Sequence, residues 1–200
     1  KAFDSNFGFA PILGTFTDPT LPSGFKPFNI QNIGGLLYVT YGKSSGAMLG
    51  DGFVDVFDAN GNFIRRLVSG GAGSMLYSPW GMAVAPLGFG TLGGDLLVGN
   101  FGNGEINAFD STTGAYIQTL TNSSNSPIVN ASLWGLTFGN GGNGGDPNKL
   151  YFTAGLDNEA HGLFGSLTND SPSTAPVPEP GSLLLIASGI AGVVARKVRR

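Results

Sequence analysis

The sequence predicts an all-β fold built from repeated four-stranded units, followed by a single membrane-spanning helix at the C-terminus. Three observations lead to this prediction. Glycine supplies 34 of 200 residues without a Gly-X-Y period, which favours tight turns over helices. A pattern of short apolar segments recurs about every fifty residues. The chain also ends in an uncharged apolar run with a basic tip.

The repeat is clearest around two tryptophans. "SPWGMAVAP" at residues 78–86 recurs as "SLWGLTFGN" at residues 132–140, so Trp80 and Trp134 stand 54 positions apart. A third copy, "KPFNIQNIG", places Phe28 52 positions before Trp80. Each copy leads into a second apolar segment: "LLYVTYG", "DLLVGNFG" and "KLYFTAG". These segments are rich in β-branched and aromatic residues and are separated by Gly or Asn, which predicts strands.

In the first two units, a third and a fourth segment are predicted to form a hairpin, whereas the third unit has the shorter segment "HGLFGSL". In "VFDANGNFIRRL" the dipeptide at Asn60 and Gly61 suits a tight turn between two apolar runs. "AFDSTTGAYIQTL" is the counterpart, turning at Thr113 and Gly114. Four strands in about fifty residues match the size of a propeller blade. The alternative is a β-sandwich or an irregular all-β domain.

We therefore predict a partial β-propeller over residues 1–168, with about three and a half four-stranded blades. The blades are expected at residues 24–70, 78–122 and 132–168, and residues 1–20 resemble the last two strands of an earlier blade. Propellers have about four to eight blades. The sequence starts at Lys1 rather than Met and shows no signal-peptide pattern. We expect the natural protein to be longer at its N-terminus.

A Ser/Thr/Pro linker is expected at residues 169–180, and a membrane helix with a basic tail at residues 181–200. The uncharged run of residues 181–195 would form a helix of about 22 Å, short of an about 30 Å hydrocarbon core. Extending it to Val198 reaches an adequate length if the basic side chains snorkel. A buried terminal helix is the alternative. The span residues are Ser182, Leu183, Leu184, Leu185, Ile186, Ile190, Val193 and Val194.

The charge distribution orients this helix. The basic residues at the tip are Arg196, Lys197, Arg199 and Arg200. They place the C-terminus in the cytoplasm and the body outside it, because positive residues stay on the cytoplasmic side. The rest of the chain holds six basic and thirteen acidic residues, which argues against nucleic-acid binding. The absence of cysteine excludes disulfides, thiolate metal sites and cysteine nucleophiles.

The tail "VPEPGSLLLIASGIAGVVARKVRR" resembles a PEP-CTERM sorting signal, in which a Pro-Glu-Pro motif precedes a membrane helix and an Arg-rich end. The motif here is Pro178, Glu179 and Pro180. The resemblance implies recognition and cleavage by an exosortase, a membrane-embedded enzyme resembling cysteine transpeptidases. The body resembles an uncharacterised bacterial family with this tail and propeller-like repeats. The segments that carry this resemblance are "FTDPTLPSGFKPFNIQNIGGLLYVTYG" and "WGLTFGNGGNGGDPNKLYFTAGLDNEAHGLFGSL".

Few residues suggest chemistry in the body. Asp157, Glu159 and His161 alternate, so in an extended segment they would share one face and could hold a metal; the alternative is a polar loop at a blade edge. Asp58, Asn60 and Asn62 have the spacing that begins a calcium loop, but the later glutamate is missing. The hairpin turn accounts for these three residues. We therefore predict no cofactor, with calcium as the alternative.

The sequence predicts a non-enzymatic, exported, surface-associated protein that binds extracellular polysaccharide or another surface protein. Trp80 and Trp134 are expected to pack in the core rather than to line a sugar site, because they occupy equivalent repeat positions. The rival hypothesis is a lactonase- or lyase-like propeller enzyme with a metal near its axis. Its candidate ligands would be Asn29, Asn100, Asp157 and His161. A structural protein of the extracellular matrix is a third alternative.

Overall fold

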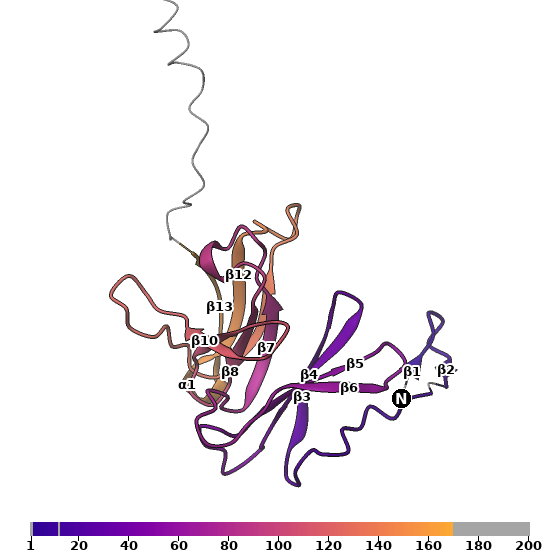
Figure 1. The fold of residues 1–200 in the computed structure, drawn as a ribbon. Helices are drawn as coiled ribbons and strands as arrows, with labels where there is room; N and C mark the ends of the chain where they lie inside the picture. The colour runs from indigo at the N-terminus through magenta and orange to yellow at the C-terminus, as the bar shows by residue number, and fades with distance from the viewer. Residues whose placement is uncertain (1, 12, 170–200) are drawn as a thin grey trace, which may run out of the picture. The chain divides into compact units, whose positions relative to one another are not determined.

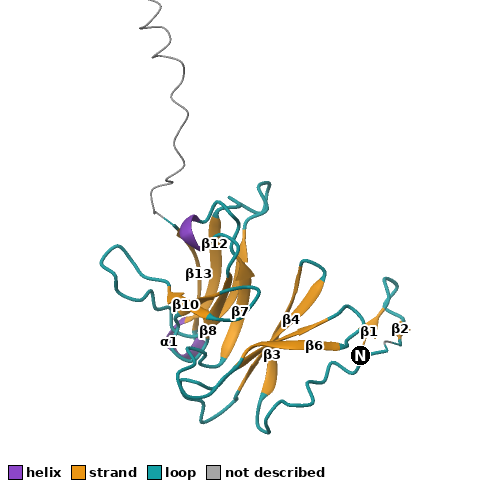
Figure 2. Ribbon diagram, viewed as in Figure 1, coloured by secondary structure: helices purple, strands orange, loops and turns teal. Residues whose placement is uncertain are grey.

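The computed structural model describes residues 2–11 and 13–169 (Figure 1). Strands joined by turns and loops dominate these residues, which confirms the predicted all-β class (Figure 2). The helical elements among them are two short turns, η1 (Gly90–Leu92) and α1 (Leu156–Glu159). The predicted linker motif, membrane helix and basic tip lie outside the described residues.

The strands form three successive antiparallel meanders, in which each strand pairs with its neighbour in the chain. Sheet 1 contains β3 (Lys26–Ile33), β4 (Leu36–Gly42), β5 (Phe53–Phe57) and β6 (Phe63–Val68). Sheet 2 contains β7 (Pro79–Val84), β8 (Leu96–Asn100), β9 (Ile106–Phe109) and β10 (Tyr116–Thr119). Sheet 3 contains β11 (Leu133–Phe138), β12 (Lys149–Gly155) and β13 (His161–Thr168).

The three sheets pack on one another in chain order, with sheet 2 in the middle. Its first strand, β7, contacts both β3 and β4 of sheet 1 and β11 of sheet 3. Side chains alternate between the two faces of each strand, so sheet 2 contributes one set to each neighbour. Met82 and Val98 belong to the core shared with sheet 1, whereas Ala83 and Leu97 belong to the core shared with sheet 3.

A hairpin with one signature occurs three times. A short hairpin of β1 (Ala2–Phe3) and β2 (Phe9–Ala10) precedes sheet 1. In each hairpin an aspartate carboxylate, from Asp4, Asp58 or Asp110, accepts backbone N–H groups of the turn. Each also carries a T-shaped or near-perpendicular aromatic pair; the pairs are Phe3–Phe9, Phe57–Phe63 and Phe109–Tyr116. The residues before sheet 1 therefore repeat the outer hairpin of sheets 1 and 2.

The hairpin tips connect neighbouring units. The Arg65 guanidinium of β6 donates hydrogen bonds to the carbonyl oxygens of Ser111 and Thr112 in the tip that follows β9. The tip that follows β5 is held in the same way by an earlier segment, since the Gly14 and Phe16 N–H groups donate to carbonyl oxygens of residues 60 and 61. Residues 14–16 therefore take, against sheet 1, the place that β6 takes against sheet 2.

Candidate functional site

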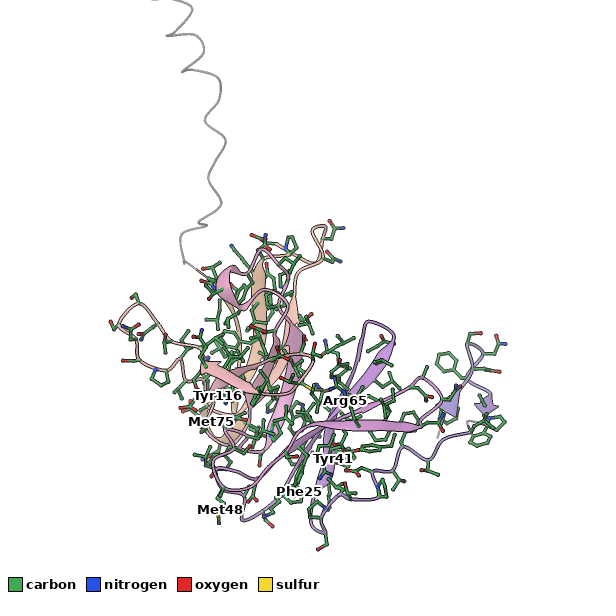
Figure 3. The ribbon with its side chains drawn as sticks, viewed as in Figure 1. Phe25, Tyr41, Met48, Arg65, Met75 and Tyr116 are labelled. Atoms are coloured by element: carbon green, nitrogen blue, oxygen red, sulfur yellow. The ribbon has the colours of Figure 1, made fainter. Side chains whose placement is uncertain are left out.

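Sheet 1 has one face that no other sheet covers within the part of the chain that the structure describes. We call the face that carries Ile30, Val39, Tyr41 and Asp55 the open face. It holds an open cavity of about 570 Å³ between the inner strands β3 and β4 and the segment before them. The lining residues are Phe16, Thr17, Asp18, Leu21, Pro27, Phe28, Asn29, Ile30, Val39 and Tyr41. Apolar side chains dominate this lining, and Figure 3 labels Tyr41, which contributes a hydroxyl group.

Residues 16–21 cover the half of the open face that β5 and β6 form, which we call the outer half. Phe16 packs against Phe57 with ring centroids 5.8 Å apart. The Asp18 carboxylate accepts hydrogen bonds from the backbone N–H and the hydroxyl of Thr20, at 2.7 and 2.8 Å, which shapes the segment into a turn. The cavity is what remains uncovered over the inner half of the face.

A buried ion cluster attaches this segment to the sheet. Arg66 of β6 lies between two carboxylates: it forms an ion pair with Asp18, and its Nε lies 3.2 Å from Asp55 Oδ1. Neither carboxylate side chain is exposed to solvent. The guanidinium also lies over the Phe53 ring, 4.3 Å from its centroid. Arg66 is therefore the ion-pair partner of both buried carboxylates. The second oxygen of Asp55, Oδ2, has no hydrogen-bond partner.

The imbalance of charge separates the pKa values of the two acids. Burial raises the pKa of Asp55 to about 7, and the neighbouring Asp18 charge adds to this, while Arg66 opposes it. Burial also opposes ionisation of Asp18, but the hydrogen bonds from Thr20 and the charge of Arg66 hold its pKa below the ordinary value. Burial and the nearby acids raise the pKa of Tyr41 to about 12, so its hydroxyl stays protonated.

Two carboxylates with separated pKa values are a common pattern in acid–base catalysis. Here, however, only Asp18 lines the cavity among the described residues, and its charge is already paired with Arg66. Sheet 2 has a neutral counterpart, because Asn107 pairs with Val98 as Asp55 pairs with Val39. The cluster is therefore best explained as an anchor between a chain segment and a sheet.

The cluster predicts a measurable pH dependence, which Asp55→Asn should remove. Because the pKa of Asp55 is higher in the folded protein, folding favours its protonated form, and stability is lost as pH rises from about 4 to about 7. The wild type should lose up to about 1.4 kcal/mol per pH unit relative to the variant in this interval. Urea unfolding at pH 5, 6, 7 and 8 measures this difference. Parallel curves for the two proteins would contradict the prediction.

Asn107 explains why this substitution should fold. Its side-chain N–H donates to the Met75 carbonyl oxygen at 3.0 Å, and its oxygen accepts the Thr119 hydroxyl at 2.6 Å. A buried amide at this repeat position is thus compatible with the sheet. In the Asp55→Asn variant the amide oxygen can still accept from Arg66 Nε, so the geometry of the cluster is preserved.

The predicted metal candidates do not form a three-residue site. Asp157 and Glu159 lie in the tight turn between β12 and β13, where residues 157–159 all have positive φ, and so they do not share one face of an extended strand. His161 begins β13, and its Nε2 lies 3.9 Å from Asp157 Oδ2 at the surface. Within residues 2–11 and 13–169 no three His, Cys, Asp or Glu side chains gather in a metal-binding arrangement.

The other polar candidates have local structural partners. Asp58 accepts hydrogen bonds from the backbone N–H groups of Asn60 and Asn62, as expected of the turn. Asn100 is buried, accepts from the Tyr77 N–H and donates to the Met75 carbonyl oxygen, and so orients the chain entering β7. Asn29 accepts from the adjacent backbone N–H. Asp58 and Asn100 thus have structural roles, whereas Asn29 also lines the cavity on the open face.

The aromatic residues at equivalent repeat positions stack across the sheets. The ring centroids of Phe28 and Trp80 are 5.0 Å apart, and those of Trp80 and Trp134 are 6.0 Å apart with an angle of 16° between the ring planes. Each ring therefore packs on the next. Trp80 is only partly buried and Trp134 is exposed, so the predicted core position is wrong for Trp134. The stack ends at Trp134, which is 40% exposed, and begins at Phe28, which lines the cavity.

A second hollow lies at the loop end of sheet 1 and measures about 560 Å³. The loops that line it expose Met48 and Leu49, and Figure 3 labels Met48. An ion pair between Lys43 and Asp51, at 2.7 Å, holds the loop that carries them.

The C-terminal residues of the chain match a known protein-sorting motif. The PEP-CTERM protein-sorting motif matches residues 176–200, a range that contains all of the predicted motif, span and basic residues. The chain thus carries a C-terminal segment that matches the PEP-CTERM protein-sorting motif. Across residues 2–11 and 13–169, no helix has the length and apolar character needed to cross a membrane.

The chain is also similar to three uncharacterized proteins of Acanthamoeba polyphaga mimivirus. The first is 38% identical over 181 residues, covering 84% of this chain and 42% of that protein. The second is 35% identical over 179 residues, covering 84% and 46%. The third is 31% identical over 162 residues, covering 76% and 29%. The chain spans less than half the length of each of these relatives.

Proposed function

We propose that this chain belongs to an exported, surface-associated β-propeller that an exosortase sorts and cleaves at the C-terminal PEP motif. The body would lie outside the cytoplasm, held first by one membrane helix and released to the cell surface or the extracellular matrix after processing. The observation that carries this proposal is the match of residues 176–200 to the sorting motif. Its role there would be to bind polysaccharide or a surface protein, or to contribute structure.

Two features of the body support the propeller. Two four-stranded meanders and a three-stranded one follow one another in chain order, so the third unit has one strand fewer than predicted, and successive sheets pack face to face. The first strand of each sheet places an aromatic ring in a continuous stack, as repetition around an axis requires. The charge-poor sequence without cysteine is compatible with this location.

The sorting proposal is tested by changing the Pro-Glu-Pro motif while leaving the rest of the linker unchanged. In cells that contain the exosortase, the wild type should lose its C-terminal tail, whereas Pro178→Ala/Pro180→Ala should keep it. Proline in general disfavours helix and favours an extended backbone, which suits binding in a protease cleft, whereas alanine permits helix. Intact-mass spectrometry of the exported protein measures the tail directly.

Pro172→Ala is the matched control, because it removes a proline of the same linker that lies outside the matched range. It should be processed like the wild type. Removal of the C-terminal tail from the double variant at the wild-type rate would contradict the sorting proposal. A glycan array probed with the processed body then separates a polysaccharide-binding role from a purely structural one.

A further inference from the structure

Equivalent positions of the three sheets differ in one respect. The cross-strand pairs that correspond are Ile30–Val39, Met82–Val98 and Leu136–Phe152. Met82 is 0% exposed and Leu136 is 5% exposed, but Ile30 is 56% exposed. The same repeat position is therefore core in sheets 2 and 3 and solvent-facing in sheet 1.

The covering side chains follow one rule in the two covered sheets. The face of sheet 2 that carries Met82 shares a core with Tyr38, Val54 and Val56, from the second and third strands of sheet 1. The face of sheet 3 that carries Leu136 shares a core with Ala83, Leu97 and Ala108 of sheet 2. In both cases the cover is the opposite face of the preceding sheet. Over the open face of sheet 1, the inner half has the cavity instead.

Part of a preceding sheet is already present in the chain. The β1–β2 hairpin has the aspartate turn and aromatic pair of the outer hairpins of sheets 1 and 2. The first ring of the pair is the exception in burial: Phe3 is 59% exposed, against 0% for Phe57 and 2% for Phe109. The second ring, Phe9, is 67% exposed, and its equivalent Tyr116 is also exposed, at 45%. Phe3 therefore lacks the packing that its equivalents have within a complete stack of sheets.

We infer that the open face of sheet 1 is the docking surface for the inner strands of a further sheet of the same repeat, carried in the same polypeptide. Those strands would complete the sheet whose outer hairpin is β1–β2. They would place β-branched or aromatic side chains in the cavity, as Tyr38, Val54 and Val56 are placed against sheet 2. An aromatic ring in their first strand would stack on Phe28, which extends the series that Trp80 and Trp134 continue.

Two considerations favour a sheet of the same polypeptide over a foreign partner. The relatives are more than twice as long as the part that this chain covers, which leaves room for further repeats. Residues 14–18, which follow the β1–β2 hairpin, already lie along the outer half of the open face. Strands that pair with the β1–β2 hairpin would therefore lie over the inner half, formed by β3 and β4. The inference rests on the repeat architecture of the proposed function and does not depend on the sorting signal.

Single-cysteine labelling tests this inference, because the sequence contains no cysteine. The protein is expressed from its own gene with Ile30→Cys, or with Ile64→Cys as the control. Ile64, on β6, is 49% exposed, close to the exposure of Ile30, but lies outside the cavity. The thiol at position 30 should react with a maleimide at least about tenfold more slowly than that at position 64, since the docked sheet must first open.

Each outcome decides a separate point. Equal labelling rates at positions 30 and 64 overturn the docking surface. Protection of position 30 that appears only at high protein concentration shows that a second copy of the protein covers the open face. This result would overturn the inference that the covering sheet belongs to the same polypeptide. Thr17→Cys, also in the cavity lining and exposed, repeats the test if the first variant fails to fold. C-terminal processing is measured independently by mass, so equal labelling with normal processing leaves the sorting proposal standing.

Discussion

Replacing Arg66 with methionine is expected to destabilise the body by about 3–5 kcal/mol, the typical effect of leaving a buried charge unpaired. Arg66 is the partner of both Asp18 and Asp55, whose side chains have no exposure to solvent. Methionine preserves part of the aliphatic stem but removes the charge and the guanidinium that lies over the Phe53 ring. The loss should be greatest near pH 8, where Asp55 is ionised, and smaller near pH 5, where its protonation leaves one anion.

Equilibrium urea unfolding of the full chain in detergent micelles, followed by tryptophan fluorescence, measures this loss. Arg65→Met is the matched control: the neighbouring arginine donates to two backbone carbonyl oxygens and pairs with no buried acid, so about 1 kcal/mol is expected. Neutralising the cluster in Asp18→Asn/Asp55→Asn/Arg66→Met should recover at least half of the loss. Equal effects of the two single arginine variants would show that the buried pairing does not stabilise the fold.

The strand order was predictable because it rests on local signals. Short segments rich in β-branched and aromatic residues, separated by Gly or Asn, predicted four strands in each unit; this is confirmed in sheets 1 and 2 and wrong for the three-stranded sheet 3. The turns at Gly61 and Gly114 have the positive φ that the hairpin interpretation required. The spacing of Trp80 and Trp134 identified equivalent repeat positions, and their rings stack, although the predicted core position is wrong for the exposed Trp134. Each of these signals lies within one repeat or compares two copies of it, so a single sequence contains the necessary information.

The ion cluster was missed because its members are far apart in the chain. Asp18 and Arg66 are separated by 48 positions. A partial signal was available: Asp55 interrupts the apolar run "FVDVF", and a charge at a core position of a strand requires a partner. The sequence does not say which residue supplies the partner, because that depends on how residues 16–21 cross the sheet.

The turn at residues 157–159 was missed for a different reason. Alternation of polar residues predicts a shared face only in an extended segment, and three successive residues with positive φ reverse the chain instead. Such backbone conformations are rare outside glycine, so composition gives little warning of them. The cavity on the open face was also beyond prediction, since it depends on which faces of the sheets are covered.

The second large effect is expected at the hairpin tip that joins sheet 2 to sheet 1. Gly114→Ala should destabilise the body by about 3 kcal/mol, through an unfavourable backbone conformation and a steric clash. Gly114 has φ +73°, and a methyl group there would lie well inside contact distance of the Leu67 carbonyl oxygen. Leu67 belongs to β6, and a backbone oxygen of a paired strand cannot rotate away. The tip must therefore move off sheet 1.

Gly73→Ala separates the two contributions. Gly73 has a similar φ of +83°, but a methyl group there meets no atom within 4 Å, so only the backbone term of about 1 kcal/mol remains. Urea unfolding of both variants and of the wild type at one pH gives the difference directly. A displaced tip should also weaken the contact of Arg65 with Thr112, so Arg65→Met should cost less in the Gly114→Ala background than in the wild type. Equal losses of stability in the two glycine variants would contradict the predicted close contact between the tip and sheet 1.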